Sequence, residues 1–486
     1  MENSRKSPRR NKRDSLPLVF ERALEEILAR VCVSTSTAAP VLAVAYSGGL
    51  DSSVLLRLAA EWAQARGWPL HALHIHHGLS ANADRWLEHC RHEAMRQSIP
   101  FHAAEVEVKQ SDPHGVEQAA RLARYRQLGI LCRQLGATLL LTGHHQDDQA
   151  ETVFLQMMRG SGLPGLSGMP QLQQDSILLG GGVALARPLL GVPRRALQQA
   201  ARQLQLASVE DESNADVRYR RNAVRHKLFP VVTSEFPAFS SCLTRVATHV
   251  QTAQRLLDEV AQADLIVCAA DQAGEALQMA ALQRLSSDRL GNLLRYWLYR
   301  QGVSLPSATR LEEIRWQMLE AASDTHPCFD FGAVQLRRVK NRLELHPVLS
   351  ALPLCPVSLQ WQGQALIDVP AWDGRLVFEW APGPGLAPEQ LRAGTLAIRP
   401  RSGSERLKPA LNRPSRNLKQ LFQERAIPAW QRARLPLLYL DGRLIFVGGV
   451  GMDARIAASS PGIVLKWQGA AATITEHEPG RTPDRV

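Results

Sequence analysis

Several features that mark large classes of proteins are missing from this sequence. No apolar run reaches about 18 residues, so we expect no membrane-spanning helix and no membrane partner. The basic N-terminal segment is not followed by a long apolar stretch, unlike a secretory signal. The seven cysteines are far apart and include no Cys-x-x-Cys pair, which argues against a disulfide framework or a zinc ribbon. We therefore expect a protein of the reducing cytoplasm.

The net charge of +11 is concentrated in two segments. Residues 1–13 hold six basic side chains and one acidic, and residues 392–434 hold eleven basic and two acidic. These excesses together exceed the net charge, so the rest of the chain is slightly acidic. Such a distribution predicts contact with a polyanion such as a nucleic acid. The alternative is a solvated tail in an arginine-rich protein, since only eight of the 57 basic residues are lysine.

Strand and helix patterns alternate along residues 14–230. Val41–Tyr46 is a continuous apolar run, as in a buried parallel strand, and Ser52–Ala65 follows with helical spacing. The same alternation predicts strands at Leu70–His76, Phe101–Val108 and Thr138–Leu141, and helices at Ala83–Met95, Val116–Leu135 and Asp148–Met158. The pattern indicates an α/β fold, a doubly wound parallel sheet of Rossmann-like type with its site at the carboxyl ends of the strands.

The length of 486 residues predicts several domains. We expect a disordered basic tail over 1–20, a catalytic domain over 21–235, and a helical central domain over 236–346 that ends in a hairpin. Prolines and glycines are frequent over 347–391, which predicts a linker. A small, basic α+β C-terminal domain over 392–470 follows, with a helix near Asn417–Glu424, a hairpin at Asp441-Gly442 and a tail over 471–486.

A glycine-rich loop stands between the first strand and the first helix of this region, and it reads Ser47-Gly48-Gly49-Leu50-Asp51-Ser52-Ser53. The glycines allow close approach to an anion, and the helix start directs its positive end at that anion. Asp51 repels phosphate, so we expect it to hold Mg²⁺ that bridges to phosphate oxygens. The loop lacks the Gly-Lys-Ser/Thr of a Walker A motif, which disfavours a kinase or P-loop ATPase. A tight turn with a helix cap is the alternative.

The loop resembles the SGGxDS loop of the ATP pyrophosphatases. Further segments occur in the same order as in the tRNA(Ile)-lysidine synthetase family, and this resemblance spans roughly residues 40–230, with later domains like the family's long form. These segments are His74–Leu79, Ala119–Tyr125, Gly143–Thr152, Arg159–Gly162 and Asp211–Asn214.

The resemblance implies an ATP-dependent ligase that joins lysine to C2 of the wobble cytidine of an isoleucine tRNA. It implies an adenylated intermediate, with ATP converted to AMP and pyrophosphate, and it makes Mg²⁺, tRNA and free lysine the expected cofactor and partners. A homodimer is left open. The alternatives are another ATP pyrophosphatase, such as a tRNA thiolase or an amide-forming synthetase, or a non-catalytic RNA-binding relative.

The resemblance assigns Ser47–Ser52 to ATP and makes Asp51, Asp148, Glu151 and Arg121 the expected catalytic residues. Asp148 and Glu151 are three apart on a predicted helix, so their carboxylates face one way and match the positions that capture the lysine substrate. Helix capping is the alternative for this pair. Either Arg121 or Arg124 could neutralise the triphosphate, with surface ion pairing as the alternative.

Three further groups of polar residues remain. The histidines at 74, 76, 77, 144 and 145 read as polar caps of strand ends rather than metal ligands, because no HExxH-like set is present. The cluster from Arg218 to Lys227 could follow the tRNA backbone or be a solvated helix face tethered by Asp211. In the basic C-terminal domain, we expect the tRNA-binding residues to be Arg399, Arg401, Arg413, Arg416, Lys419 and Arg432, while the nearby Phe422 and Trp430 pack in a core.

Overall fold

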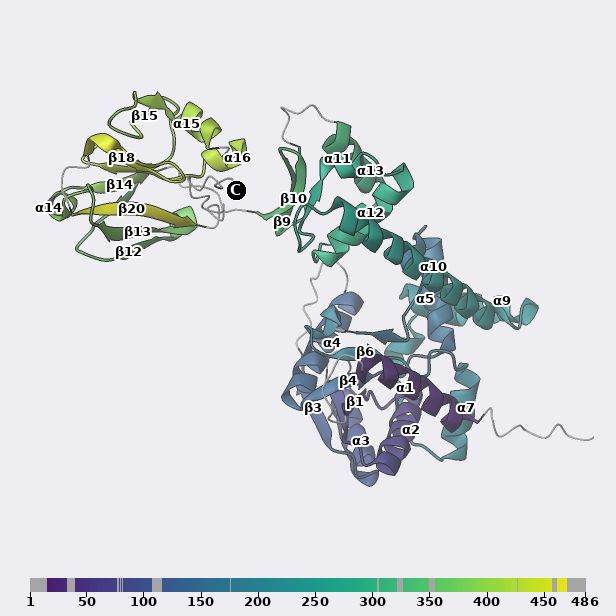
Figure 1. Ribbon diagram of the computed structural model, residues 1–486. Helices are drawn as coiled ribbons and strands as arrows, with labels where there is room; N and C mark the ends of the chain where they lie inside the picture. Colours follow the sequence, from purple (N-terminus) through teal and green to yellow (C-terminus); the bar gives the residue numbers. More distant parts are fainter. Residues whose placement is uncertain are drawn as a thin grey trace, which may run out of the picture. The chain divides into compact units, whose positions relative to one another are not determined.

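A computed structural model of the chain (Figure 1) describes residues 15–32, 40–76, 78, 80, 82–106, 116–174, 176–303, 306–320, 327–348, 355–425, 427–456 and 461–469. The chain divides into two compact units, Met1–Glu259 and Val260–Val486, and each has hydrophobic clusters of its own. Among the helices within those ranges, none has the length and apolarity needed to cross a membrane. The predicted tails 1–14 and 471–486 lie outside the described residues.

The first unit is built on a six-stranded sheet with the strand order β3-β2-β1-β4-β6-β5. The first five of these strands pair in parallel, and only β5 is antiparallel. Their bounds are β1 Val41–Ala45, β2 Leu70–His76, β3 Phe101–Glu105, β4 Ala137–Leu141, β5 Leu172–Gln173 and β6 Ala184–Ala186. Apolar strands with helices between them must be covered on both faces, so the doubly wound α/β prediction is confirmed.

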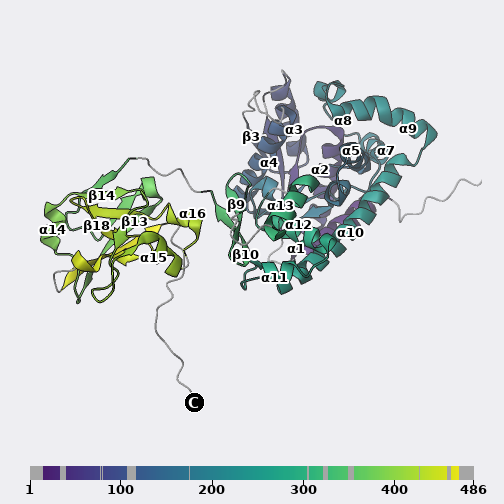
Figure 2. The same ribbon diagram turned by 90° about the horizontal axis from the view of Figure 1, so that it is seen from above.

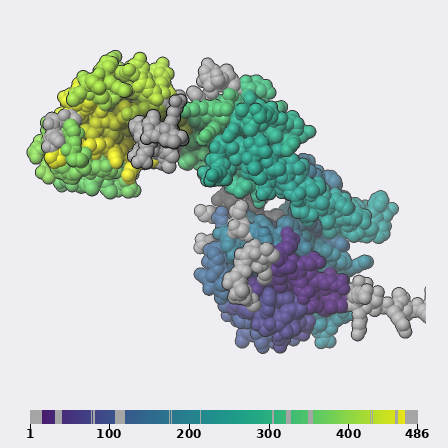
Figure 3. All heavy atoms as spheres, viewed as in Figure 1, coloured from purple at the N-terminus to yellow at the C-terminus, as the bar shows by residue number. Residues whose placement is uncertain are grey.

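Helices cover both faces of this sheet (Figure 1). The core on one face takes residues from α1 (Leu16–Cys32), α2 (Leu50–Arg66), α3 (Ala83–Arg96) and α7 (Arg194–Gln203), and α4 (Val116–Gln134) packs on the other. The predicted 1–20 tail is wrong at its end, because α1 begins at Leu16. Phe20, Leu24 and Ile27 are buried at helical spacing on its inner side, and its outer side forms part of the unit's surface, in purple in Figure 3.

Further helical elements of the first unit precede and follow the last strands of the sheet. They are α5 Gln146–Met158, α6 Leu163–Leu166, η2 Ile177–Leu179, η3 Glu212–Ala215, α8 Arg220–Ala223, the π-helix η4 Val224–Leu228, α9 Phe229–Glu235 and α10 Phe239–Cys268, which continues past Glu259 into the second unit. Phe154, Phe229 and Phe239 meet edge to face in a small core. This core fixes α8, η4 and α9 against α5, where the predicted lysine-capturing carboxylates lie.

The second unit begins with a helical module closed by a four-stranded antiparallel sheet of order β7-β10-β9-β8. Trp297 on α12 is fully buried at its centre. The hairpin predicted at Val334–His346 is confirmed. The elements are β7 Ala276–Gln278, α11 Met279–Leu282, α12 Ser287–Arg300, α13 Ala308–Glu320, β8 Cys328–Asp330, β9 Val334–Val339 and β10 Arg342–Pro347.

The linker predicted over 347–391 is wrong, because residues from Val357 onward fold into the C-terminal sheets. The segment forms β11 Val357–Leu359, β12 Leu366–Val369, η5 Pro370–Trp372, β13 Gly374–Ala381 and α14 Pro388–Ala393. Trp361, Trp372, Leu376 and Phe378 are buried in one core with later strands. The prolines and glycines here include the first residues of η5, β13 and α14, and Asp373 adopts a φ of 49° between η5 and β13.

The rest of this domain completes two antiparallel sheets, of order β11-β14-β17-β18-β19 and β12-β13-β20. Figure 2 shows β13, β14 and β18 together in one body. The predicted helix near 417–424 and the hairpin at Asp441-Gly442 are confirmed. The elements are β14 Leu396–Arg399, β15 Arg406–Leu407, β16 Arg416–Asn417, α15 Leu418–Glu424, α16 Ala429–Arg432, β17 Leu437–Leu440, β18 Arg443–Val447, β19 Gly451–Met452, η6 Ala454–Ile456 and β20 Gly462–Gly469.

Candidate active site

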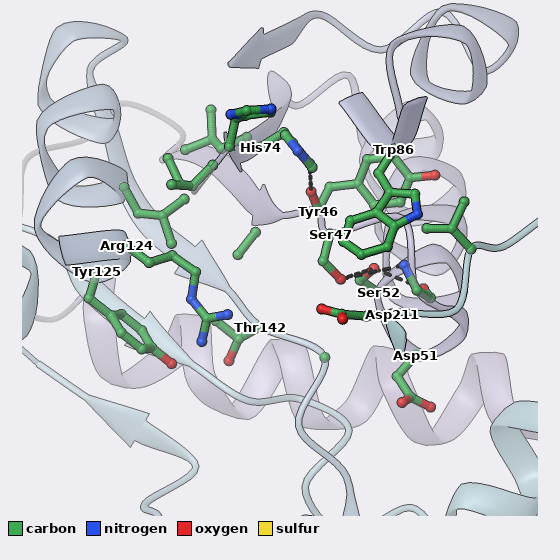
Figure 4. Close-up of a pocket in the computed structure, with 18 of the residues that line it drawn as sticks. Tyr46, Ser47, Asp51, Ser52, His74, Trp86, Arg124, Tyr125, Thr142 and Asp211 are labelled. Carbon is green, nitrogen blue, oxygen red and sulfur yellow. Dashed lines mark hydrogen bonds between the residues drawn. The ribbon is translucent and has the colours of Figure 1, made fainter. Parts of the chain in front are cut away.

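A cavity of about 330 Å³ opens at the carboxyl ends of β1, β2 and β4 in the first unit (Figure 4). A doubly wound sheet places its ligand there, because the loops that follow neighbouring strands meet at that edge. Its lining includes Tyr46, Trp86 and Thr142, and Asp211 of the motif at 211–214 also reaches it. Of the predicted ATP loop, Ser47, Gly49, Asp51 and Ser52 line the cavity, whereas Gly48 and Leu50 do not.

The glycine-rich loop is held in shape by close packing and by its serines. Gly48 has a φ of 82°, and a Cβ there would lie 2.7 Å from the Cys90 sulfur, so a side chain does not fit. The Ser52 hydroxyl donates to the Gly49 carbonyl at 2.9 Å and lies 3.1 Å from the Ser47 hydroxyl (Figure 4).

The start of α2 is open to an anion. Gly49 is its N-cap residue, and no side chain caps the helix. The first N–H groups of a helix have no partner within the helix, so a bound phosphate can satisfy them. A capped tight turn, the alternative reading of this loop, would have used a side chain at this position. The observed geometry therefore favours phosphate binding.

Asp51 in the first turn of α2 has one oxygen near two basic side chains and one without a hydrogen-bond partner. Its Oδ2 lies 3.5 Å from His145 Nε2 and 4.0 Å from Arg194 Nε. Its Oδ1 is buried and has no hydrogen-bond partner. Within the described residues no group of three or more metal-binding side chains occurs. Mg²⁺ keeps several water or phosphate ligands and needs only one or two carboxylates, so the free oxygen of Asp51 fits that ion.

His145 connects the phosphate loop with α5. It is the N-cap of α5. Its ring accepts a hydrogen bond from the Asp148 backbone N–H, and the His145 backbone N–H donates to the Asp148 carboxylate at 3.0 Å. Burial lowers the pKa of His145, but the carboxylates of Asp51 and Asp148 outweigh it, and the pKa is raised overall. The two loops touch directly, since a Cβ on Gly143 would lie 3.1 Å from the Asp51 carbonyl. His145 therefore caps the start of a helix, whereas the sequence predicted a polar cap at a strand end.

Asp148 and Glu151 form a four-membered ion cluster with two arginines. Arg225 donates to Glu151 at 2.6 Å and to Asp148 at 2.9 Å, and Arg221 donates to Glu151 at 2.8 Å and to Asp148 at 2.9 Å. The Glu151 side chain is 1% exposed. Burial raises the pKa of Asp148, but the positive charges of His145 and Arg221 outweigh it and lower the pKa to about 2. The low pKa keeps Asp148 ionised, both predicted carboxylates are paired with arginines, and Asp148 also serves the capping alternative.

The basic cluster after Asp211 divides into inner and outer residues. Arg221 and Arg225 point to α5, where Asp148 and Glu151 tether them. Arg218 pairs with Asp216 at 2.7 Å on the surface. The remaining basic side chains of the cluster, Arg220 and Lys227, are exposed. The sequence showed these charges but not their partners, because the paired carboxylates lie 70 to 77 residues earlier in the chain.

Two arginines of α4 stack on one tyrosine beside the cavity. The guanidinium carbons of Arg121 and Arg124 lie 5.0 and 5.7 Å from the ring centroid of Tyr125. Arg187 is also hydrogen-bonded to Tyr125. Only Arg124 of the arginine pair lines the cavity, as Figure 4 shows, whereas Arg121 does not reach its lining. Burial lowers the pKa of Arg124, which indicates a cation short of solvent.

The six predicted tRNA-binding residues differ in their surroundings. Arg399 stacks on Tyr439 and Arg401 on Phe422, which is fully buried in the core as predicted. Arg432 donates to the Ile427 carbonyl at 2.8 Å, and Arg416 pairs with Glu424. These four side chains have structural contacts. The two that are simply exposed are Arg413 and Lys419.

Comparison with known proteins gives agreement along most of the chain. Residues 18–232 match the family model described as the PP-loop domain, 277–344 the TilS substrate binding domain, and 396–467 the TilS substrate C-terminal domain. The chain is 42% identical to the tRNA(Ile)-lysidine synthase of Ralstonia nicotianae, over 93% of this chain and 97% of that protein. It is 40% identical to that of Burkholderia pseudomallei (87% and 91%) and 37% identical to that of Methylococcus capsulatus (87% and 95%).

Proposed function

We infer that this chain, which belongs to the tRNA(Ile)-lysidine synthase family, is an ATP-dependent ligase that forms a carbon–nitrogen bond between lysine and a cytidine of tRNA(Ile). The observation that carries this conclusion is the uncapped start of α2 at the base of the cavity, with the free oxygen of Asp51 beside it. An open helix end suits the phosphates of ATP, and a neighbouring free carboxylate oxygen suits the metal ion that accompanies them.

The first step activates the cytidine. The C2 carbonyl oxygen of the wobble base attacks the α-phosphorus of ATP, the bond to the bridging oxygen breaks, and pyrophosphate leaves with the electron pair. Asp51 would hold Mg²⁺, which would neutralise negative charge on the phosphates. The N–H groups at the start of α2 bind the phosphate oxygens. Arg124 adds positive charge from the opposite wall of the cavity, where burial strengthens its interaction with an anion.

The cluster of Asp148, Glu151, Arg221 and Arg225 suits the amino-acid end of lysine. Two carboxylates and two guanidinium groups sum to zero charge, so the cluster cannot accept a lone cation without losing an arginine contact. The α-amino and α-carboxylate groups of lysine have opposite charges. We propose that the carboxylates hold the α-ammonium group while an arginine turns to the α-carboxylate, which leaves the side-chain amine free to react.

The second step forms the new bond. The side-chain ammonium group of lysine, with a usual pKa of about 10.4, must first give a proton to a neighbouring carboxylate or phosphate, because only the neutral amine has an electron pair to donate. The neutral nitrogen attacks C2 of the adenylated base, the bond from C2 to the adenylate oxygen breaks, and AMP leaves. The cytidine must leave its stack in the anticodon loop to reach the cavity.

The basic C-terminal domain binds the tRNA backbone in this proposal. Arg413 and Lys419 are the residues of this domain best placed to contact tRNA phosphates, because both are exposed and lie in the segment with the largest excess of positive charge. Neutralised phosphates release counterions, so these residues supply affinity without reading the base sequence. The cavity is the part that selects the wobble base.

The test is ATP-dependent incorporation of radiolabelled lysine into a tRNA(Ile) transcript. We expect one AMP and one pyrophosphate for each lysine incorporated. A transcript with uridine at the wobble position and a chain with Asp51→Ala serve as controls, and neither should take up label. Release of ADP, or equal labelling of the uridine transcript, would refute the proposal.

A further inference from the structure

Two side chains beside the phosphate loop each have a buried polar atom without a hydrogen-bond partner. The Nε of Arg194 and the Oδ1 of Asp51 are both buried and lack hydrogen-bond partners, although the two side chains approach to 4.0 Å through Asp51 Oδ2. A buried N–H without an acceptor loses the hydrogen bond that it made with water. Such an arrangement is costly unless a ligand completes it. Arg194 was not among the residues singled out in the sequence.

The position of Arg194 is set by its backbone. It is the first residue of α7, directly after Pro193, and its N–H donates to the Asp147 carboxylate at 2.9 Å. The start of α5 adds a second tie, because the Gln146 N–H donates to the Val192 carbonyl at 2.9 Å. Buried Leu197 anchors α7 in the core that it shares with α2. Arg194 is thus fixed beside the first turn of α2.

The groups around this position carry both signs of charge. Asp51 faces the basic side chains of His145 and Arg194, while the carboxylates of Asp147 and Asp148 approach His145. The Arg194 side chain is 41% exposed although its Nε is covered, so part of it stays accessible to an incoming group. A guanidinium group can donate two parallel hydrogen bonds to phosphate oxygens.

We propose that Arg194 binds the pyrophosphate end of ATP and holds the departing pyrophosphate, a contact that rests on the proposed function. Its donors meet the outer phosphate oxygens on one side while the N–H groups of α2 meet them on the other. The bond to the α-phosphorus breaks as charge grows on the leaving pyrophosphate. A fixed cation at that point stabilises the transition state more than the bound ATP.

The test compares Arg194→Met with Arg195→Met. Arg195 is the next residue, carries the same charge and is exposed, so its variant controls for net charge and helix composition. Pyrophosphate binding is measured by calorimetry on the full chain, with and without Mg²⁺. We expect Arg194→Met to weaken binding roughly tenfold to hundredfold in both conditions, and Arg195→Met to leave it unchanged. Arg194→Lys should recover part of the affinity, since it restores the charge without the paired donors.

Each other outcome has a definite meaning. If the Arg194 and Arg195 variants bind pyrophosphate equally, the proposed contact is wrong. If Arg194→Met weakens binding only with Mg²⁺ present, the arginine acts by positioning Asp51, which also overturns the contact. Thermal unfolding of each variant shows whether the fold is retained. If the unaltered chain binds pyrophosphate through Arg194 but incorporates no lysine, the proposed function fails while this contact stands.

Discussion

Replacing Arg225 by methionine should destabilise the first unit strongly, because it leaves a buried carboxylate short of a partner. Arg225 donates to Glu151 through Nε at 2.6 Å and through Nη2 at 2.9 Å, and to Asp148 at 2.9 Å. Glu151 is almost fully buried, so water cannot replace the lost donors. Methionine keeps much of the volume of the arginine stem and removes the charge.

The expected magnitude follows from the burial of the pair. Removing one partner of a buried ion pair costs about 3–5 kcal/mol. Arg221 still donates to Glu151 at 2.8 Å, which places the loss near the lower end. For a unit of about 150–250 residues, each kcal/mol lowers the melting temperature by roughly 2–4 °C, so a loss of about 3 kcal/mol lowers it by roughly 6–12 °C.

Calorimetry and urea unfolding of the full chain measure this effect, with Arg218→Met as the matched control. Arg218 lies a few residues earlier and pairs with Asp216 on the surface, where its side chain is 88% exposed. We expect no measurable change for that variant. Adding Glu151→Gln to Arg225→Met should recover part of the stability, since it removes the unpaired charge. An Arg225→Met protein that unfolds at the original temperature would refute the reasoning about this cluster.

Three further predictions concern the site and the tRNA surface. Asp51→Ala should abolish pyrophosphate release from ATP and leave tRNA binding intact, and normal turnover of this variant would refute the metal role. Folding lowers the pKa of Asp148, so its ionised carboxylate stabilises the folded state. This stabilisation is present above about pH 4 and is lost as the pH falls toward 2. Urea titrations should therefore show that Asp148→Asn loses about 2 kcal/mol at pH 6 and about 1 kcal/mol at pH 3 from this charge, whereas a constant loss would contradict the pKa. Changing Arg413 and Lys419 together to glutamine should lower the slope of log affinity against log salt for tRNA by about 1.4–1.8, while an unchanged slope would show that neither contacts phosphate.

Short-range patterns predicted the catalytic fold well. The strand Val41–Ala45, the glycine-rich loop and the helix from Leu50 lie within 26 residues of one another. The hydrophobic spacing within this short stretch is enough to predict each of these elements. Gly48 is a case in point, since its positive φ and its lack of space for a side chain suit glycine alone. A strand, a tight turn and an open helix end are enough to locate a phosphate site.

The C-terminal domain shows where composition misleads. Frequent proline and glycine over 347–391 suggested a linker, yet β13 pairs along its whole length with β20, the last strand of the domain. Its partner lies near the end of the described chain, so no local pattern shows that the strand is covered. A truncation near Pro388 would therefore remove part of the core around Leu376 and Phe378. Point substitutions on the surface are the sounder test of tRNA binding.

The ionic partners of the site were beyond the reach of sequence spacing. Asp148 and Glu151 were found because they share one helix face, but the arginines that pair with them follow 70 to 77 residues later. Those arginines, four residues apart, lie on a short helix and on the π-helix that follows it. Their pairing changes the chemistry of the site. Two isolated carboxylates would attract any cation, whereas a neutral cluster of four charges favours a ligand that brings both signs. The amino-acid end of lysine does so, and a simple amine or a polyamine does not.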